Sequence, residues 1–377
     1  GPFDKTTRCV MPAAALSPFI NISWISDLPY GKELPATSEL TTDYSALASS
    51  TLMTSIQGVW HYNGSGAIAS GNAIAAEVGT AGVATNPNGA GMTYTASAKL
   101  QSGITFDGTD DYVGVAYTQT AVNDYTIALW FKTSSAANNV FVQDRGSGAG
   151  KSLTLGIGNN PGGCAAGKIS YGLDTNAIYK GKCTSSTYND GNWHHLVGVW
   201  DGTAAVAVAN AQFTIYVDGV SVATTDVSAG GATNAPLTGL GNTKFGRHDA
   251  WGVFLNGSMD EVAIWSRPLS ATEVQQLYRR GANRVKVQVR SCSSPTCFDN
   301  PVWQGYDGSA ATFFTEYNNN SLPATMAGSV LTGLPVMLFS AFISVIFANT
   351  QWFQYKLTLE SDSSTLVPSV KSVSTSY

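Results

Sequence analysis

The fold is decided by residues 257–278, GSMDEVAIWSRPLSATEVQQLY. Val262 and Ile264 lie in an apolar run, which predicts a buried strand that ends before the proline. Ser270 and Glu273 then form the Ser-x-x-Glu pattern of a capping box, in which each side chain binds the backbone N–H of the other residue. Apolar residues follow the box at helical spacing. The stretch therefore predicts one buried strand followed by a short helix.

Short alternating segments lie upstream of this stretch, each bounded by Gly, Asn or Asp. They cover residues 104–106, 112–116, 125–131, 195–200 and 213–217. Many short strands at regular spacing are typical of a β-sandwich. We therefore expect residues 51–283 to form a large β domain. Residues 1–50 are expected to form an N-terminal strand and linker segment.

A second, smaller β unit is expected over residues 284–377. Val285, Val287 and Val289 alternate with polar residues, so they share one face of a strand. Residues 352–360 alternate in the same way. The chain is thus expected to be all-β, with a large sandwich followed by a small β-sandwich.

The composition indicates a weakly charged protein. Charged residues make up 12 % of the 377 residues, about half the usual level of roughly 25 %. The formal net charge is -5, and no run of Lys or Arg offers binding sites for nucleic-acid phosphates. The composition is therefore typical of a β-rich surface protein, and we expect no nucleic-acid partner.

The five cysteines suggest two disulfides. Cys164 and Cys183 flank a Gly-rich loop, and Cys292 and Cys297 close a short loop. Both pairings would imply an oxidising compartment, while a reduced, inert set of cysteines is the alternative. Cys9 is left over in either case.

Six motifs of the large domain resemble, in order, those of laminin-G-like (concanavalin A-like) jelly-roll domains. They are GVWHYN at 58–63, FDGTDDYV at 106–113, DYTIALWF at 124–131, GNWHHLV at 191–197, IYVDG at 215–219 and GSMDEV at 257–262. The flanking segments resemble parts of large, repetitive bacterial surface proteins. The resemblance implies a concanavalin A-like jelly-roll sandwich plus a smaller β-sandwich, on a bacterial cell surface or outside the cell.

Catalysis is disfavoured by the carboxylate pattern. The fold family includes endoglucanases, which place two catalytic carboxylates on one strand in a Glu-x-Asp-x-x-Glu pattern. This chain has no such run, and the adjacent Asp260 and Glu261 are expected to point to opposite faces of a strand. We therefore expect no enzyme, with a glycoside hydrolase as the remote alternative.

The same resemblance implies a structural calcium ion held by a carboxylate of the closing strand, which matches Asp260. Asp107 and Asp110, with the neighbouring Asp111, offer further oxygen ligands of the kind calcium binds. The alternative is that Asp107 and Gly108 form a turn and that Asp260 accepts hydrogen bonds from backbone N–H groups.

A ligand site is predicted where polar and aromatic residues crowd Gly-bounded loops. Four of its residues lie in GRHDAWG at 246–252, two follow another strand, and one lies in a third turn. They are Arg247, His248, Asp249 and Trp251, then Asp144 and Arg145, then Trp193. Flat aromatics with a few planar polar groups are typical of sugar binding. The alternative is that Trp193 packs under the rim and that Arg247 pairs with Asp249.

Two segments suggest self-assembly. Residues 16–24, LSPFINISW, resemble residues 366–374, LVPSVKSVS, so residues 1–25 are candidates to complete the sheet of a neighbouring subunit. The uncharged segment 330–348 is a core loop with a strand, a buried subunit contact or, least favoured, a membrane span.

These patterns together favour a non-catalytic extracellular surface or adhesion protein whose laminin-G-like domain binds a glycan or a surface protein. The alternative is a structural subunit of an extracellular filament or fibre that assembles by strand exchange.

Overall fold

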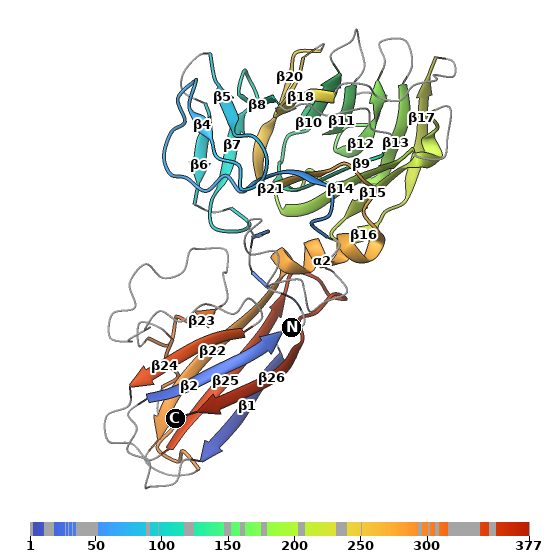
Figure 1. Cartoon of the computed structure of the whole chain (residues 1–377). Coiled ribbons are helices and arrows are strands. Elements are labelled where there is room, and N and C mark those ends of the chain that lie inside the picture. The colour runs from blue at the N-terminus through green and yellow to red at the C-terminus, as the bar shows by residue number, and fades with distance from the viewer. Residues whose placement is uncertain are drawn as a thin grey trace. The chain divides into compact units, whose positions relative to one another are not determined.

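The computed structural model divides the chain into two compact units (Figure 1). It describes residues 3–10, 19–26, 28, 30–31, 33–34, 52–87, 91–96, 98–116, 124–146, 152–158, 163–174, 179–202, 208–230, 240–249, 251–292, 296–300, 302–305, 309–315, 340–346 and 352–376. Residues 34–278 form the large unit, and residues 1–33 with 279–377 form the small unit. The backbone alone is described for residues 3–10, 19–26, 116, 145–146, 240–241, 291–292, 314–315, 340–346, 352–353 and 371–376.

Two large antiparallel sheets make up most of the described part of the large unit. The nine-stranded sheet runs in the order β17 (Thr224–Ala229), β13 (Tyr179–Thr187), β12 (Lys168–Asp174), β11 (Ser152–Ile157), β10 (Asn139–Gly146), β18 (Leu240–Phe245), β8 (Tyr112–Ala116), β5 (Gly82–Thr85) and β4 (Ala73–Ile74). The eight-stranded sheet runs in the order β16 (Val220–Ser221), β15 (Phe213–Val217), β14 (Trp193–Asp201), β9 (Asp124–Lys132), β21 (Asn256–Trp265), β7 (Gly103–Asp107) and β6 (Thr93–Thr95), with β3 (Ile56–Trp60) also paired to β21. A one-turn 3-10 helix, η1 (Asn210–Gln212), precedes β15. The predicted all-β sandwich is confirmed.

Strand β21 contributes to two apolar clusters. Val262 and Ile264 point into the core between the two sheets, as predicted. The intervening Ala263 and the following Trp265 belong to a second cluster on the other face of the eight-stranded sheet, which we call the outer cluster. Because side chains alternate along a strand, both faces of β21 are buried.

The helix after β21 closes the outer cluster. It is α2 (Ala271–Ala282), and it begins at the predicted capping box. The Ser270 N–H donates to Glu273 Oε2 at 2.9 Å, and the Glu273 N–H donates to Ser270 Oγ at 3.3 Å. Burial alone would raise the pKa of Glu273, but hydrogen bonds from Arg267 and Ser270 outweigh it and lower that pKa to about 2. The reciprocal cap and the ion pair therefore fix where the helix begins.

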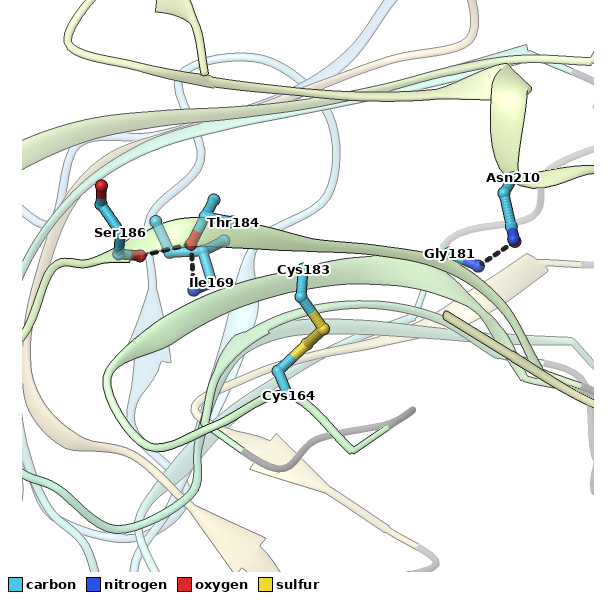
Figure 2. Close-up of a disulfide and its surroundings, with 7 residues drawn as sticks. All are labelled: Cys164, Ile169, Gly181, Cys183, Thr184, Ser186 and Asn210. Atoms are coloured by element: carbon cyan, nitrogen blue, oxygen red, sulfur yellow. Dashed lines mark hydrogen bonds between the residues drawn. A yellow bond between two sulfur atoms is a disulfide. The ribbon is translucent and has the colours of Figure 1, made fainter. Parts of the chain in front are cut away.

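A disulfide joins the segment before β12 to β13 (Figure 2). Cys164 and Cys183, the pair considered from the sequence, have Cα atoms 5.6 Å apart. Beside it the β12–β13 register shifts, and the hydroxyl of Thr184 accepts from the Ile169 N–H and donates to the carbonyl of Ser186. This hydroxyl bridges a gap in the backbone ladder.

Cys297 is also disulfide-bonded. The side chain of Cys292, its predicted partner, lies outside the described part of the chain, as does that of Cys9. The Cys292–Cys297 pairing therefore stays a prediction.

The described residues of the small unit form two antiparallel sheets. One has the order β1 (Phe3–Val10), β25 (Trp352–Ser361), β22 (Asn283–Cys292) and β23 (Phe314–Thr315), and the other has the order β24 (Ser340–Ile346), β2 (Phe19–Ser26) and β26 (Val370–Ser376). The alternating segments at 284–290 and 352–360 form β22 and β25, and Val285, Val287 and Val289 are buried as predicted.

Residues 1–33 group with the small unit rather than with the linker that follows them. Strand β1 pairs with β25, and β2 lies between β24 and β26 of the same chain (Figure 1). The sequence left open whether these residues pack on their own chain, and here they do.

The uncharged segment 330–348 is described only in part. Residues 340–346 form β24, and residues 330–339 lie outside the described residues. Among the described residues, none of the helices has the length and apolarity needed to cross a membrane.

Candidate functional site

The predicted loop 246–252 forms a hairpin that folds over β10. Its strands are β19 (Arg247–His248) and β20 (Val253–Phe254). The Asp249 N–H donates to Oε1 of the buried Gln143 at 2.9 Å, and the Gly246 N–H donates to the carbonyl of Phe141. Gly246 has a φ of 87°, and a Cβ there would lie 2.8 Å from the ring of Phe106, so only glycine fits this entry to the hairpin.

An aromatic side chain is presented at the tip of this hairpin. Trp251 is 44 % exposed, and its ring stacks on the buried ring of His248 with centroids 4.8 Å apart and an interplanar angle of 29°. The stack on His248, which is itself buried, holds the Trp251 ring in place. Trp251 is thus a flat, fixed surface that is open to solvent on one side.

Charged groups lie beside this aromatic surface. Asp249 Oδ1 lies 2.5 Å from Lys244 Nζ and 3.2 Å from Arg247 Nε. The pair of Arg247 with Asp249 is the alternative given above to a ligand role for Arg247. Both cations also lie over the ring of Tyr112, at 5.0 and 4.7 Å from its centroid. Two cations on one carboxylate leave positive charge and N–H donors at the edge of the site.

Tyr112 and Lys244 were not among the residues predicted from the sequence. Both lie on strands of the nine-stranded sheet, β8 and β18, which pair with one another. Their contact with the hairpin depends on that pairing, which joins segments about 130 residues apart. The only sequence signal was the position of Tyr112 at the end of the FDGTDDYV motif.

Asp144 does not belong to the ligand site, which corrects the prediction. It is fully buried and faces the core, where the Tyr125 hydroxyl donates to its Oδ2 at 2.5 Å. Its neighbours across the sheet, Leu153 and Thr243, share that face. A ligand bound outside the sandwich therefore cannot contact this carboxylate. Arg145 follows on β10, and its side chain lies outside the described part.

Trp193 lies in the other sheet, half-buried at the start of β14, opposite Lys132 of β9. The next residue, His194, has Nδ1 2.8 Å from Asp218 Oδ2 and Nε2 3.2 Å from Asp190 Oδ1. Burial alone would lower the pKa of His194, but the hydrogen bond to Asp218 and the charges of both carboxylates outweigh it and raise that pKa. These pairs hold the turn that follows Trp193, and the role predicted for Trp193 in ligand binding stays a prediction.

The three residues predicted to bind a metal do not form one group. Asp107 and Asp110 lie together, with Asp111, in the turn between β7 and β8. Asn256 of β21 is the residue that pairs with Asp107. Asp260 lies four residues further along β21, and hence about 13 Å from Asn256. Its Oδ2 accepts from the Leu100 N–H at 2.8 Å, the backbone role considered as the alternative.

The turn that holds the three aspartates has its own internal hydrogen bonds. The Thr109 N–H donates to Asp107 Oδ1 at 2.8 Å, and the Asp107 N–H donates to Asp111 Oδ2 at 3.2 Å. Burial is the main cause that raises the pKa of Asp111 to about 6, and the charges of Asp107 and Asp110 add to it.

The carboxylates of Asp260 and Glu261 are both buried, and each accepts a hydrogen bond from a backbone N–H. Glu261 lies at an irregularity of β21 with a φ of 53°, and its Oε1 lies 2.5 Å from His61 Nδ1. Its Oε2 accepts from the Leu34 N–H at 3.2 Å. Two catalytic carboxylates must flank the glycosidic bond of a sugar that enters from solvent, and neither of these two buried carboxylates is exposed in that way.

Comparison with known proteins gives a family for this part of the chain. Residues 107–275 match the Laminin_G_3 family, described as the concanavalin A-like lectin/glucanases superfamily. A search of curated proteins gives no match.

Among solved structures, similar chains include domain 4 of a GH43 extracellular arabinanase from Geobacillus stearothermophilus in complex with arabinotriose. It is 16 % identical with a TM-score of 0.42, and the match covers 59 % of this chain and 98 % of that one. A sialidase of Trypanosoma rangeli is 14 % identical with a TM-score of 0.39. The match covers 59 % of this chain but only 32 % of the sialidase chain. A SAP-like pentraxin of Limulus polyphemus is 14 % identical with a TM-score of 0.32, and the match covers 46 % of this chain and 79 % of the pentraxin chain.

The order of the motifs, the two-sheet sandwich and the family match agree. Residues 107–275 of this chain therefore belong to the concanavalin A-like lectin/glucanases superfamily, as a laminin-G-like jelly-roll domain.

Proposed function

We propose that the laminin-G-like domain is a non-catalytic module that binds carbohydrate at the β19–β20 hairpin. The observation that carries the proposal is Trp251, an exposed ring held flat against the buried His248. The apolar face of a sugar ring packs on such a surface, while fixed donors beside it bind hydroxyl or carboxylate oxygens. Arg247 and Lys244 supply those donors, and Asp249 orients them.

The site also supports a binding role rather than a catalytic one. The carboxylate of Asp249 is paired with two cations, and Asp144 is buried in the core. General acid and base work on a glycosidic bond needs two carboxylates that face the sugar from opposite sides. The described residues around Trp251 offer a platform and donors instead.

The proposed location is outside the cell or on the bacterial cell surface. The disulfide between Cys164 and Cys183 supports it, since structural disulfides persist in oxidising compartments.

Replacing Trp251 with Ala tests the binding proposal. The full-length chain is screened on a glycan array, and the best binders are measured by calorimetry. We expect Trp251→Ala to weaken binding about fivefold to thirtyfold, since aromatic packing contributes roughly 1–2 kcal/mol at such sites. Phe298→Ala is the matched control, because Phe298 is 89 % exposed in the small unit and outside the site.

Two results would contradict the proposal. One is glycan binding by Trp251→Ala that equals wild type. The other is a wild-type chain that binds no glycan but is retained by a surface protein, which would make the ligand a protein.

A second candidate function, assembly by strand exchange, is supported by the position of β2. This N-terminal strand lies between β24 and β26, although the whole large unit separates them along the chain. A strand that fits its own small unit also fits that of a second copy. Native material imaged by electron microscopy should then show filaments that a chain lacking residues 1–26 does not form. Filaments of the same form from the shortened chain would remove the idea.

A further inference from the structure

Arg247 differs from the other arginines in its hydrogen bonding. Its Nε lies 3.2 Å from Asp249 Oδ1, but within the described part of the chain its two terminal nitrogens donate no hydrogen bond. The other arginines with described side chains each donate at least one hydrogen bond from a terminal nitrogen, and they are Arg267, Arg279, Arg280, Arg284 and Arg290. The outer donors of Arg247 are therefore left for a group that the described residues do not supply.

The guanidinium of Arg247 is nevertheless held in place. Its carbon lies 4.7 Å from the ring centroid of Tyr112 on β8 and 5.3 Å from that of Phe254, the residue opposite it in the hairpin. The side chain is 28 % exposed, and Nε is buried whereas the terminal nitrogens are not. Two aromatic rings and one carboxylate thus fix the inner part of the group and leave its outer edge open to solvent.

The charge around this guanidinium is positive. Lys244 Nζ lies 2.5 Å from the same Asp249 oxygen, so one carboxylate serves two cations. Among the described residues, neither cation forms an ion pair with another carboxylate. The carboxylate of Asp111, the residue before Tyr112, accepts from the Asp107 N–H in its own turn. One positive charge of the trio is therefore left uncompensated.

We propose that Arg247 binds the carboxylate of an acidic sugar, so that the ligand class is a glycan containing uronic acid. The two outer N–H donors of a guanidinium match the two oxygens of a planar carboxylate. A hydroxyl group offers a single oxygen and no charge, so a neutral sugar would leave the fork half used. The inference rests on the proposed function, because it takes the sugar ring to pack on Trp251 of the same hairpin.

A comparison of acids with their esters tests the ligand class on the wild-type chain. Trigalacturonate and a hyaluronan hexasaccharide are each titrated by calorimetry beside their methyl esters, which keep the sugar rings but lose the charge. We expect at least one acid to bind roughly tenfold to a hundredfold more tightly than its ester, the usual effect of hydrogen bonds to a charged group. Added sodium chloride should reduce that preference.

Arg247→Lys tests the fork. Lysine keeps the charge but loses the two parallel donors, so binding of the acid should weaken about tenfold while binding of the ester stays unchanged. Arg290→Lys is the matched control, because Arg290 also lies over an aromatic ring, that of Trp303 at 4.3 Å, but its terminal nitrogens are hydrogen-bonded within the small unit. Thermal melts show whether both variants are folded, and the comparison of acid with ester needs neither.

Several results would overturn the inference. They are equal binding of acid and ester by the wild-type chain, no binding of either acid, equal weakening of acid and ester by Arg247→Lys, and tighter binding of sulfated galactotriose than of trigalacturonate.

The proposed function fails in a different way. Acid binding that Arg247→Lys reduces and Trp251→Ala leaves unchanged would contradict packing on Trp251 and keep the carboxylate site. Binding of neutral glycans alone, reduced by Trp251→Ala, would keep the proposed function and remove the carboxylate site.

Discussion

Replacing Trp265 with Ala should lower the free energy of unfolding of the large unit by about 3–5 kcal/mol, the usual cost of truncating a fully buried Trp. The side chain of Trp265 is fully buried in the outer cluster, between the eight-stranded sheet and α2. Its Nε1–H also donates to the carbonyl of Leu52 at 2.7 Å. The substitution leaves a cavity beside Val274 and Leu277. It also removes one of the two hydrogen bonds that the Leu52 carbonyl accepts, the other being donated by Arg267.

Chemical denaturation followed by circular dichroism measures this loss. Trp251→Ala is the matched control, because it removes the same side chain from an exposed position and should change stability by less than about 0.5 kcal/mol. Equal effects of the two substitutions would show that the outer cluster does not hold α2 on the sheet.

The second large effect is expected at the disulfide. Replacing both Cys164 and Cys183 with Ser should cost about 3 kcal/mol, since the bond closes a loop of 19 residues in the unfolded chain. The loss arises mostly from the greater freedom of the unfolded state, so the folded sheet around Thr184 should keep its circular dichroism spectrum.

Reductant gives the control for this prediction. It should destabilise the wild-type chain by a similar amount and have a much smaller effect on the double variant, which retains the disulfide of Cys297. A double variant as stable as the oxidised wild type would mean that the loop is already ordered in the unfolded state.

Local patterns in the sequence were sufficient to place β21 and α2. Val262 and Ile264 fix which face of the strand meets the core, and the box of Ser270 and Glu273 fixes where the helix starts. Both signals act between residues a few positions apart, so they do not depend on which distant strands pair with one another. The family resemblance then supplied the sandwich.

The candidate site was predictable only in part because it depends on strand register. A register shift between Val140 and Val142 sets the phase of β10, and Asp144 thereby faces the core together with Leu153. No alternation in the sequence reveals such a shift. Contacts between Tyr112, Lys244 and Arg247 likewise follow from pairing of distant strands, and the predicted link from Asp107 to Asp260 failed for the same reason.

The strand order of the small unit has a consequence for synthesis on the ribosome. The large unit is one continuous segment, so it is complete when residue 278 has emerged. Strand β1, however, pairs Phe3 with Leu359, and β2 pairs with β26. At about 5–20 residues per second, these first strands wait roughly 20–70 s for their partners. During that time β1 and β2 lack the partners that they have in the folded unit, so they are open to chaperones or to another nascent copy on the same message.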